Sequence, residues 1–339
     1  MRTSNDIISN AESSDDGLVE EIEALGGQLA KVRSSIGQVI FGQAEVVDQT
    51  LITFLSGGHL LLIGVPGLAK TRLVETLGTV IGLDNRRIQC TPDLMPADIL
   101  GSEVLEEAGS GKRSFRFIKG PIFAQLLMAD EINRASPRTQ SALLQAMQEH
   151  RVTIAGETYQ LPEPFHVLAT QNPLEQEGVY PLPEAQLDRF LLQVDVDYPD
   201  LGAEREMLLA TTSITEHTAT QVMDGPSLAD AQRLIRRVPV GESVVEAILR
   251  VVRDGRPDVS GRKDLTRHIS WGPGPRASQS LMLTARARAV LEGRLSPSVE
   301  DVVALAHPVL RHRMALNFAA RADGISIDHI IDLLIEPLR

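Results

Sequence analysis

Residues 64–71, Gly64-Val65-Pro66-Gly67-Leu68-Ala69-Lys70-Thr71, decide the fold of this chain. The short apolar run 59–63 leads into them, and a helical pattern over 72–77 leads out, so the order is strand, loop, helix. A loop of this kind directs backbone N–H groups, a lysine charge and a threonine hydroxyl to one point. That combination suits a nucleoside triphosphate with Mg²⁺, and we expect ATP or GTP as the ligand. The alternative is an ordinary glycine-containing turn, which the Lys-Thr ending disfavours.

Ala69 departs from the usual pattern G-x-x-x-x-G-K-[ST], because it stands where a glycine is expected. In a conformation with positive φ, alanine would cost about 1–2 kcal/mol. In the first turn of a right-handed helix it would cost nothing. We therefore predict that Ala69 lies in the first turn of the helix.

The composition describes a chain with a large aliphatic core. The chain has 339 residues, of which 43% are hydrophobic and 4% aromatic, and this length favours two domains. The single cysteine, Cys90, excludes an intrachain disulfide and a multi-cysteine zinc site, and we interpret it as a small buried residue on a strand. No apolar run is long enough to span a membrane, and the N-terminus lacks the apolar core of a signal peptide, so we expect a cytoplasmic protein.

The first part of the chain is predicted to be a tail followed by helices. Residues 1–20 are polar and acidic, and we expect a disordered tail. Apolar residues recur at helical spacing over 18–39, with an interruption expected near Gly26-Gly27. A second amphipathic helix is predicted over 46–54, just before the phosphate-loop strand.

Five short apolar segments alternate with helical patterns and predict an α/β fold. Besides 59–63, they are residues 87–90, 126–129, 166–170 and 190–194. This alternation favours a parallel sheet with helices on both faces. Residues 114–118 and 151–161 are typical of β-hairpins inserted into that fold, either to contact a partner or as surface elaborations.

The pattern after residue 200 is helical, and no convincing strand occurs in the last hundred-odd residues. We therefore predict three parts: a disordered acidic tail (1–20), an αβ nucleotide-binding domain with a P-loop parallel sheet (21–220) and a small all-α domain (221–339).

Polar residues follow two of the predicted strands. Asp130 and Glu131 end the run 126–129, where Asp130 could hold Mg²⁺ and Glu131 could polarise the attacking water. Asn172 follows the next strand, where its amide could contact the γ-phosphate and the water. The alternatives are a solvated strand end for the acidic pair and a turn before Pro173 for the asparagine.

The order of these motifs closely resembles that of the MoxR family of AAA+ ATPases. The matching stretches are GVPGLAKT (64–71), RIQCTPDLMPADILG (87–101), FIKGPIF (117–123), LLMADEINRASPRTQSALLQAMQE (126–149), LATQNP (168–173), LPEAQLDRF (182–190), GPRAS (274–278) and VLRHRMALNF (309–318). The resemblance implies an AAA+ core followed by a helical lid domain. It also implies that an alanine at position 69 is ordinary in this family.

The resemblance implies a role for each motif residue. Lys70 and Thr71 would be the Walker A pair, Asp130 and Glu131 the Walker B pair, and Asn172 the first sensor. Thr71 and Asp130 would hold the Mg²⁺ ion. Nucleotide binding is assigned to the loop and its flanks: Phe41, Gly42, Gly64, Val65, Pro66, Gly67, Leu68, Ala69, Lys70, Thr71 and Arg72.

Two arginines complete the site that the resemblance implies. Arg189 matches the arginine finger that reaches the ATP of a neighbouring subunit, and Arg276 matches the second sensor. The alternatives are a surface ion pair for Arg189 and an ordinary helix-end arginine for Arg276. Arg134 and Arg138 could also face the site between subunits. A finger supplied by a neighbour implies a homo-oligomer, and the family resemblance implies a hexameric ring.

Three functions remain open from the sequence. The first is an ATPase that remodels a protein partner in a chaperone-like manner; the resemblance implies a partner with a von Willebrand factor A domain. The second is a nucleotide-switched binding scaffold with a slow timer ATPase. The third is a nucleic-acid motor, against which the formal net charge of −12 argues.

Overall fold

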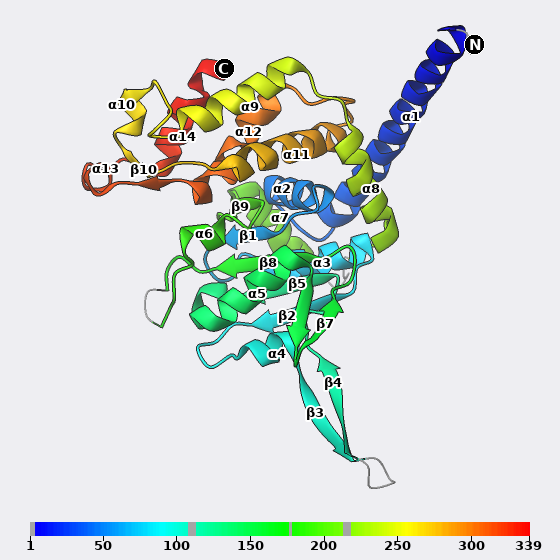
Figure 1. Ribbon diagram of the computed structural model, residues 1–339, viewed down its shortest axis with the longest axis vertical. Helices are drawn as coiled ribbons and strands as arrows, with labels where there is room; N and C mark the ends of the chain where they lie inside the picture. Colours follow the sequence, from blue (N-terminus) through cyan, green and yellow to red (C-terminus); the bar gives the residue numbers. More distant parts are fainter. Residues whose placement is uncertain (1–3, 108–112, 176–177, 213–217) are drawn as a thin grey trace. The chain divides into compact units, whose positions relative to one another are not determined.

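The chain divides into two compact units (Figure 1). The computed structural model describes residues 4–107, 113–175, 178–212 and 218–339. One unit, here the sheet unit, is Ser35–Ala229, and the other, the helical unit, combines Met1–Ser34 with Asp230–Arg339. This division differs from the predicted boundary near residue 220, and it places residues 21–34 with the C-terminal helices.

The sheet unit is built on a parallel sheet of five strands, as the sequence predicts. Its order is β2 (Asn85–Gln89), β5 (Leu126–Asp130), β8 (His166–Gln171), β1 (Leu60–Ile63) and β9 (Leu192–Asp195), with every neighbouring pair parallel. All carboxyl ends of the strands therefore meet at one edge. That edge carries the phosphate loop after β1 and the acidic pair after β5.

Helices cover both faces of this sheet, which explains the near-continuous apolar runs (Figure 1). Side chains alternate along a strand, so Leu61, Leu127 and Val167 reach one face. There they form a core with Leu143 and Met147. The helices of this unit are α2 (Ala44–Leu55), α3 (Lys70–Ile81), α4 (Pro96–Leu100), α5 (Pro137–Glu149), α6 (Glu184–Leu187) and α7 (Leu201–Thr211).

Both predicted hairpins occur in the sheet unit. In β6 (Arg151–Ile154) and β7 (Glu157–Gln160), the turn residues Ala155 and Gly156 have φ of 51° and 89°, as a tight hairpin turn requires. The strand 114–118 is β4 (Arg113–Lys119), which pairs with β3 (Gly101–Glu107). The sequence did not predict β3, because a strand with two open faces lacks the apolar alternation of a half-buried one.

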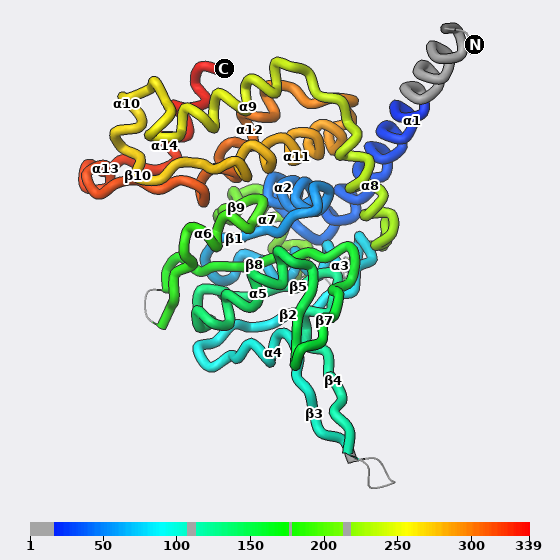
Figure 2. The backbone as a smooth tube through the Cα atoms, in the orientation of Figure 1, coloured from blue at the N-terminus to red at the C-terminus, as the bar shows by residue number. Residues whose placement is uncertain are grey.

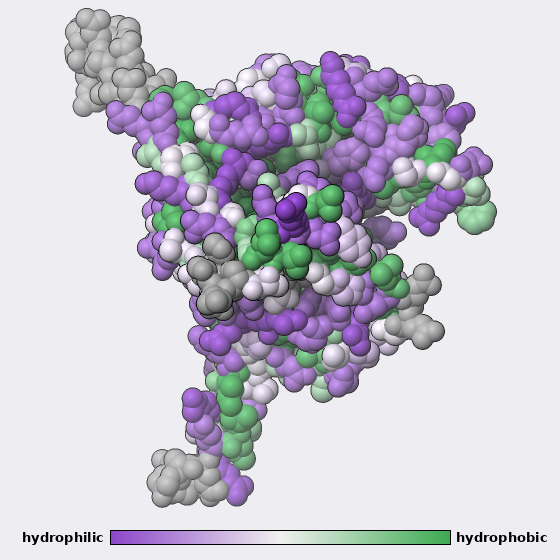
Figure 3. All heavy atoms as spheres, turned by 180° about the vertical axis from the view of Figure 1, so that it is seen from behind, coloured by the Kyte–Doolittle hydropathy of each residue, from purple (hydrophilic) through white to green (hydrophobic). Residues whose placement is uncertain are grey.

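The β3–β4 hairpin projects away from the sheet (Figure 2). Its base is held by Phe117, whose ring stacks on Tyr159 with centroids 4.3 Å apart. Further out, Leu105 and Phe115 face each other across the two strands and are exposed. They belong to the hydrophobic strip that runs along one side of the hairpin (Figure 3).

The helical unit contains the predicted C-terminal bundle. Its α9 to α14 bury apolar residues such as Leu281, Val302 and Ile331. The elements are α8 (Gly225–Arg237, which begins in the sheet unit), α9 (Glu242–Asp254), α10 (Lys263–Thr266), α11 (Pro275–Leu291), α12 (Val299–Leu310), α13 (Phe318–Ala322) and α14 (Ile327–Ile335). The 3₁₀ turns of the chain are η1 (Ile132–Arg134), η2 (Arg311–Arg313) and η3 (Glu336–Leu338).

A small antiparallel ladder corrects the prediction that this part holds no strand. It joins β10 (Ile269–Trp271) to β11 (Ala315–Leu316). Strands of two or three residues are too short to show a period of two in the sequence.

The first helix is longer than predicted. α1 runs from Ser4 to Gly37, so residues 4–20, which we expected to be a disordered tail, are helical. The interruption predicted near Gly26-Gly27 is absent. Gly26 lies where a Cβ would be 3.5 Å from the carbonyl oxygen of Val290. That distance is an ordinary van der Waals contact, so α1 packs on α11 within the helical unit and a small side chain would also fit at this position.

A buried histidine cluster makes the stability of the sheet unit depend on pH. Burial lowers the pKa of His59 to about 3, helped by the charge of His166, and burial lowers the pKa of His166 to about 4. His59 accepts a hydrogen bond from the amide of Val167, which requires a neutral ring nitrogen.

Cys90, predicted to be buried, is indeed buried, but it lies just after β2 rather than on a strand.

We expect acid to destabilise the protein through these two histidines. Above the unfolded-state pKa near 6.5 their contribution is fully present, and it is lost as the pH falls toward about 4. The free energy of unfolding should be about 2–3 kcal/mol lower at pH 5.5 than at pH 7.5. Urea denaturation at the two pH values measures this difference. His166→Asn should reduce it by about half, and equal stability at both pH values would contradict the assignment.

Candidate active site

The phosphate loop connects the end of β1 to the start of α3. Gly64 is buried against β9, where a Cβ would lie 2.7 Å from the carbonyl oxygen of Val196. Gly67 has φ of +88°. Ala69 precedes the helix with φ 54° and ψ 20°, a left-handed conformation.

The prediction of a right-handed Ala69 is therefore wrong. The loop must reverse direction within a few residues before α3 begins at Lys70, and Ala69 takes the left-handed turn at the helix N-cap. An alanine in this conformation carries a cost of about 1–2 kcal/mol. Such backbone strain is typical of functional sites.

Lys70 bonds the loop itself. Its Nζ donates to the carbonyl oxygens of Gly64 and Val65, the latter at 3.2 Å. Burial lowers the pKa of Lys70, and the charges of Asp130 and Glu131 act in the opposite direction. The charge of Lys70 therefore interacts with both carboxylates. The predicted Walker A and Walker B residues thus lie at one site.

Asp130 ends β5 with both carboxylate oxygens engaged. Thr170 of β8 donates its hydroxyl to Oδ1 at 2.5 Å, and Arg87 of β2 donates Nη2 to Oδ2 at 2.6 Å. The Thr170 hydroxyl also accepts the backbone N–H of Glu131 at 2.9 Å. Sequence reasoning missed Thr170 and Arg87. They meet Asp130 only because β2, β5 and β8 are neighbours in the sheet.

Glu131 turns away from Asp130 because its backbone is left-handed, with φ of 55°. Its Oε2 accepts hydrogen bonds from Gln89 Nε2 at 2.8 Å and from Arg134 Nη1 at 3.0 Å. Adjacent residues in different backbone conformations thus point their carboxylates in different directions. This separation fits the two different tasks that the sequence predicts for them.

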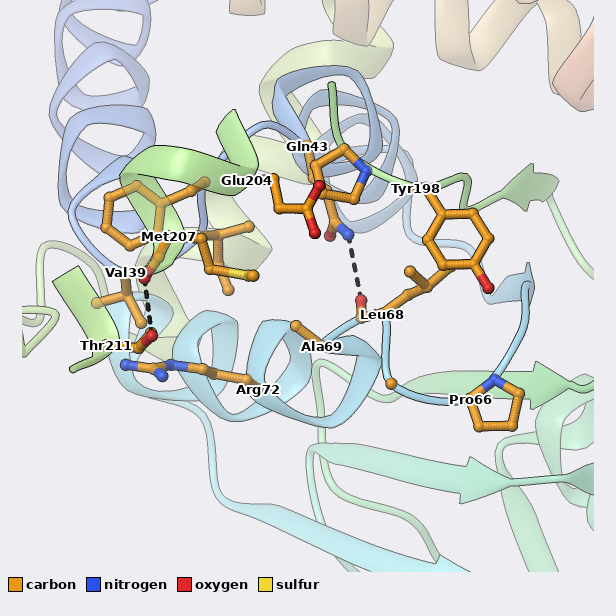
Figure 4. A pocket seen from close by; sticks show the side chains of 14 residues that line it. Val39, Gln43, Pro66, Leu68, Ala69, Arg72, Tyr198, Glu204, Met207 and Thr211 are labelled. Atoms are coloured by element: carbon orange, nitrogen blue, oxygen red, sulfur yellow. Dashed lines mark hydrogen bonds between the residues drawn. The ribbon is translucent and has the colours of Figure 1, made fainter. Parts of the chain in front are cut away.

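A cavity of about 360 Å³ lies beside the loop (Figure 4). Phe41 and Arg72, both assigned to nucleotide binding from the sequence, line it, while Gly42 is the neighbour of Phe41. Gly42 has φ of +67° and touches α7, where a Cβ would be 2.2 Å from the Cβ of Ala203. The sequence did not assign several other lining residues: Val39, Ile40, Gln43, Tyr198, Pro199, Glu204, Met207 and Thr211.

Gln43 gives this cavity a polar group. Its Nε2 donates to the carbonyl oxygen of Leu68 at 3.1 Å (Figure 4), and the Oε1 atom is buried with no hydrogen-bond partner among the described residues. The cavity thus combines mainly apolar walls with polar side chains such as Gln43 beside the phosphate loop. Small-molecule pockets of proteins commonly have this composition.

The geometry agrees with the relatives of this chain. Residues 59–192 match the model of the ATPase family associated with various cellular activities (AAA), and residues 263–333 match that of the AAA lid domain. Chaperone MoxR1 of Mycobacterium tuberculosis is 41% identical over 322 residues, which cover 95% of this chain and 83% of that protein. This chain belongs to the MoxR family of AAA+ ATPases. Protein MoxR of Paracoccus denitrificans is 31% identical over 301 residues, covering 84% of this chain and 87% of the relative.

A solved structure supports the same MoxR architecture. The crystal structure of a protein from Cytophaga hutchinsonii has a TM-score of 0.87 and 36% sequence identity, and the match covers 96% of this chain and 98% of that chain. The AAA+ fold that the sequence predicts is therefore confirmed. Membership in the MoxR family supports nucleotide binding and ATPase activity in general.

Asn172, the predicted first sensor of this MoxR protein, lies just beyond β8. It is buried, and its Oδ1 accepts the backbone N–H of Leu174 at 3.1 Å, as in the turn that was the alternative interpretation. The preceding residue, Gln171, accepts the N–H of Gly64 at 3.2 Å. Asn172 therefore lies next to the phosphate loop while it also shapes its own turn.

Arg189 lies between α6 and β9, at the opposite edge of the sheet from the phosphate loop. Leu191, two residues later, donates its backbone N–H to the carbonyl oxygen of His59, which precedes β1. The pKa of Glu149 is lowered by hydrogen bonds from Gln145 and Arg151 and, to a smaller extent, by the Arg189 charge. The Arg189 charge thus lies near Glu149 at the C-terminal end of α5, away from the phosphate loop of the same subunit.

The other predicted arginines have different positions. Arg276 is exposed at the start of α11 in the helical unit. Arg134 forms an ion pair with Glu131 of its own chain, in which Nη1 lies 3.0 Å from Oε2. Arg138 is exposed near the start of α5.

The residues of the site suit Mg²⁺. Thr71 and Asp130 offer oxygen ligands, which this ion prefers. Within the described ranges, no three or more His, Cys, Asp and Glu side chains gather as a metal cage. A bound ion would therefore complete its shell with phosphate oxygens and water.

No described helix is long and apolar enough to cross a membrane.

Proposed function

We propose that this MoxR protein hydrolyses ATP to ADP and phosphate with Mg²⁺, and that a ring of identical subunits uses the reaction to remodel a protein partner. The observation that carries the proposal is that Lys70, the first residue of α3, lies within reach of the charges of Asp130 and Glu131 at the end of β5. A helix N-terminus, a lysine and two carboxylates with different orientations are the parts that phosphoryl transfer needs.

Each residue then has a defined task. Lys70 leaves the carbonyls of its own loop to bind the β- and γ-phosphates, and Thr71 and Asp130 hold the metal. When bound, Mg²⁺ neutralises phosphate charge. Glu131 orients and polarises the attacking water, and Asn172 contacts the γ-phosphate. The cavity beside the phosphate loop, lined by Phe41, Gln43 and Arg72, takes the adenine base.

A second subunit completes the site through Arg189. The strand β9, of about 13 Å, separates Arg189 from the edge that carries the phosphate loop. An arginine finger from the same chain would have to cross this distance. A neighbour in a ring, which we propose to be a hexamer, supplies it instead, while Arg276 links the helical unit to the γ-phosphate.

The chaperone role rests on relatives. One relative carries the name Chaperone MoxR1. We propose that this chain likewise acts on a protein partner and, by its family resemblance, on one with a von Willebrand factor A domain. A nucleic-acid motor is less well supported, since the formal net charge is −12.

Dilution tests the shared site. We expect the ATPase rate per subunit to rise with protein concentration and then reach a plateau, because isolated subunits lack the finger. The rate is measured at saturating Mg–ATP from nanomolar to micromolar protein, with sedimentation at the same concentrations. A rate per subunit that does not change while the protein goes from monomer to oligomer would contradict the proposal. A slow constant rate would favour the timer scaffold.

A further inference from the structure

Arg87 holds the carboxylate that the proposed function assigns to the metal. Its Nη2 donates to Asp130 Oδ2 at 2.6 Å. The strand register places the two side chains on the same face of the sheet, since Gln89 pairs with Asp130 and lies two residues after Arg87. The contact thus follows from the pairing of β2 with β5.

The two partners differ in their freedom to move. The Arg87 side chain is 50% exposed, on the edge strand of the sheet, whereas the Asp130 side chain is 12% exposed. Asp130 is also fixed by the Thr170 hydroxyl at its other oxygen, at 2.5 Å. A competitor for Asp130 therefore displaces the arginine and leaves the carboxylate in place.

Arg87 has a second acceptor that can retain it. The same Nη2 lies 3.2 Å from Gln89 Oε1, and Gln89 in turn donates to Glu131. When the guanidinium leaves Asp130, it can stay at the edge of the site through Gln89. Arg87 thus has two acceptors within reach: Asp130, which it would release, and Gln89, which would retain it.

We propose that Arg87 is the counterion of Asp130 in the metal-free site and that it yields this carboxylate when Mg–nucleotide binds. The proposal rests on the assignment of Asp130 to the metal. A guanidinium and a divalent cation repel each other, and both would be held by the Asp130 carboxylate, so they compete for it. Arg87 therefore raises the Mg²⁺ concentration that the site requires, and it shields nucleotide phosphates from the Asp130 charge when no metal is present.

Binding of a fluorescent, non-hydrolysable ATP analogue tests this role without turnover. Wild-type protein and Arg87→Gln are titrated with Mg²⁺ at fixed analogue, and the analogue is also titrated in EDTA. Arg87→Gln should lower the Mg²⁺ concentration for half-maximal binding by about 2- to 5-fold, the factor typical of a partly exposed ion pair. In EDTA, the variant should bind the analogue about 2- to 5-fold more weakly.

Two further variants separate this role from a structural one. Arg87→Lys keeps the charge and should return the Mg²⁺ midpoint toward the wild-type value. Arg86→Gln removes a neighbouring charge on the same strand, which forms an ion pair with Asp84 at 3.9 Å, and should leave the midpoint unchanged. Thermal unfolding confirms that each variant is folded.

The outcomes distinguish the inference from the proposed function. If Arg87→Gln binds the analogue with the wild-type Mg²⁺ midpoint and the wild-type affinity in EDTA, the counterion role is overturned while the nucleotide site stands. If Arg86→Gln shifts the midpoint as much as Arg87→Gln does, general surface charge explains the effect and the inference is also overturned. If folded wild-type protein fails to bind the analogue, the proposed function itself fails.

Discussion

Glu131→Gln is expected to abolish ATP turnover while nucleotide binding is retained. The amide keeps the size of the carboxylate and can still meet Gln89, but it cannot accept the proton of the attacking water. Loss of a general base costs typically about 10²–10⁴-fold in rate. Phosphate release at saturating Mg–ATP and binding of a fluorescent ATP analogue measure the two properties separately.

A matched variant controls for the change in charge. Glu246, exposed on α9 of the helical unit, can be replaced by glutamine and should leave turnover unchanged. A Glu131→Gln protein that hydrolyses ATP at the wild-type rate would remove Glu131 from the catalytic role. Loss of binding in this variant would show that the substitution disturbs the loop as well.

Arg189→Ala should reduce turnover by about 10³-fold or more, because an arginine finger is worth about 10³ to 10⁵ in rate. Nucleotide binding should remain, since Arg189 lies at the far edge of the sheet from its own phosphate loop. Steady-state ATPase assays and analogue binding measure both effects. Arg151→Ala is the control, as Arg151 neighbours the same carboxylate, Glu149, at 3.4 Å. A fall in turnover that is equally large in both variants would contradict a specific role for Arg189.

Local sequence patterns predict most of the helices and strands of this fold. They predict fewer of the contacts between these elements. The buried strands appear as apolar runs because both faces of the sheet are covered, and Asp200, a residue type common at helix N-caps, caps α7 by accepting the N–H of Ala203. The β10–β11 ladder is too short to leave a pattern. The exposed strand β3 lacks apolar alternation, so its pairing with β4 becomes visible only in the structure.

The site shows the same limit. The placement of Lys70, Asp130 and Glu131 at one edge of the sheet could be predicted, because each follows a recognisable strand. Thr170 and Arg87 could not, since their roles depend on the order of β2, β5 and β8 in the sheet. The conformation of Ala69 was predicted wrongly, because helix propensity favours a right-handed alanine while the reversal before α3 imposes a left-handed one.

We propose that each active site combines the phosphate loop of one subunit with Arg189 of the next. Mixing two inactive variants tests it most directly. Arg189→Ala retains Glu131, and Glu131→Gln retains Arg189, so a mixed ring contains interfaces at which both residues are intact.

The ATPase rate of an equimolar mixture of these two variants is the decisive measurement. Random mixing gives both residues at about a quarter of the interfaces, so we expect a rate well above that of either variant alone, up to about a quarter of the wild-type rate. A mixture of demonstrated mixed oligomers whose rate equals the average of the two separate variants would contradict a site shared between subunits.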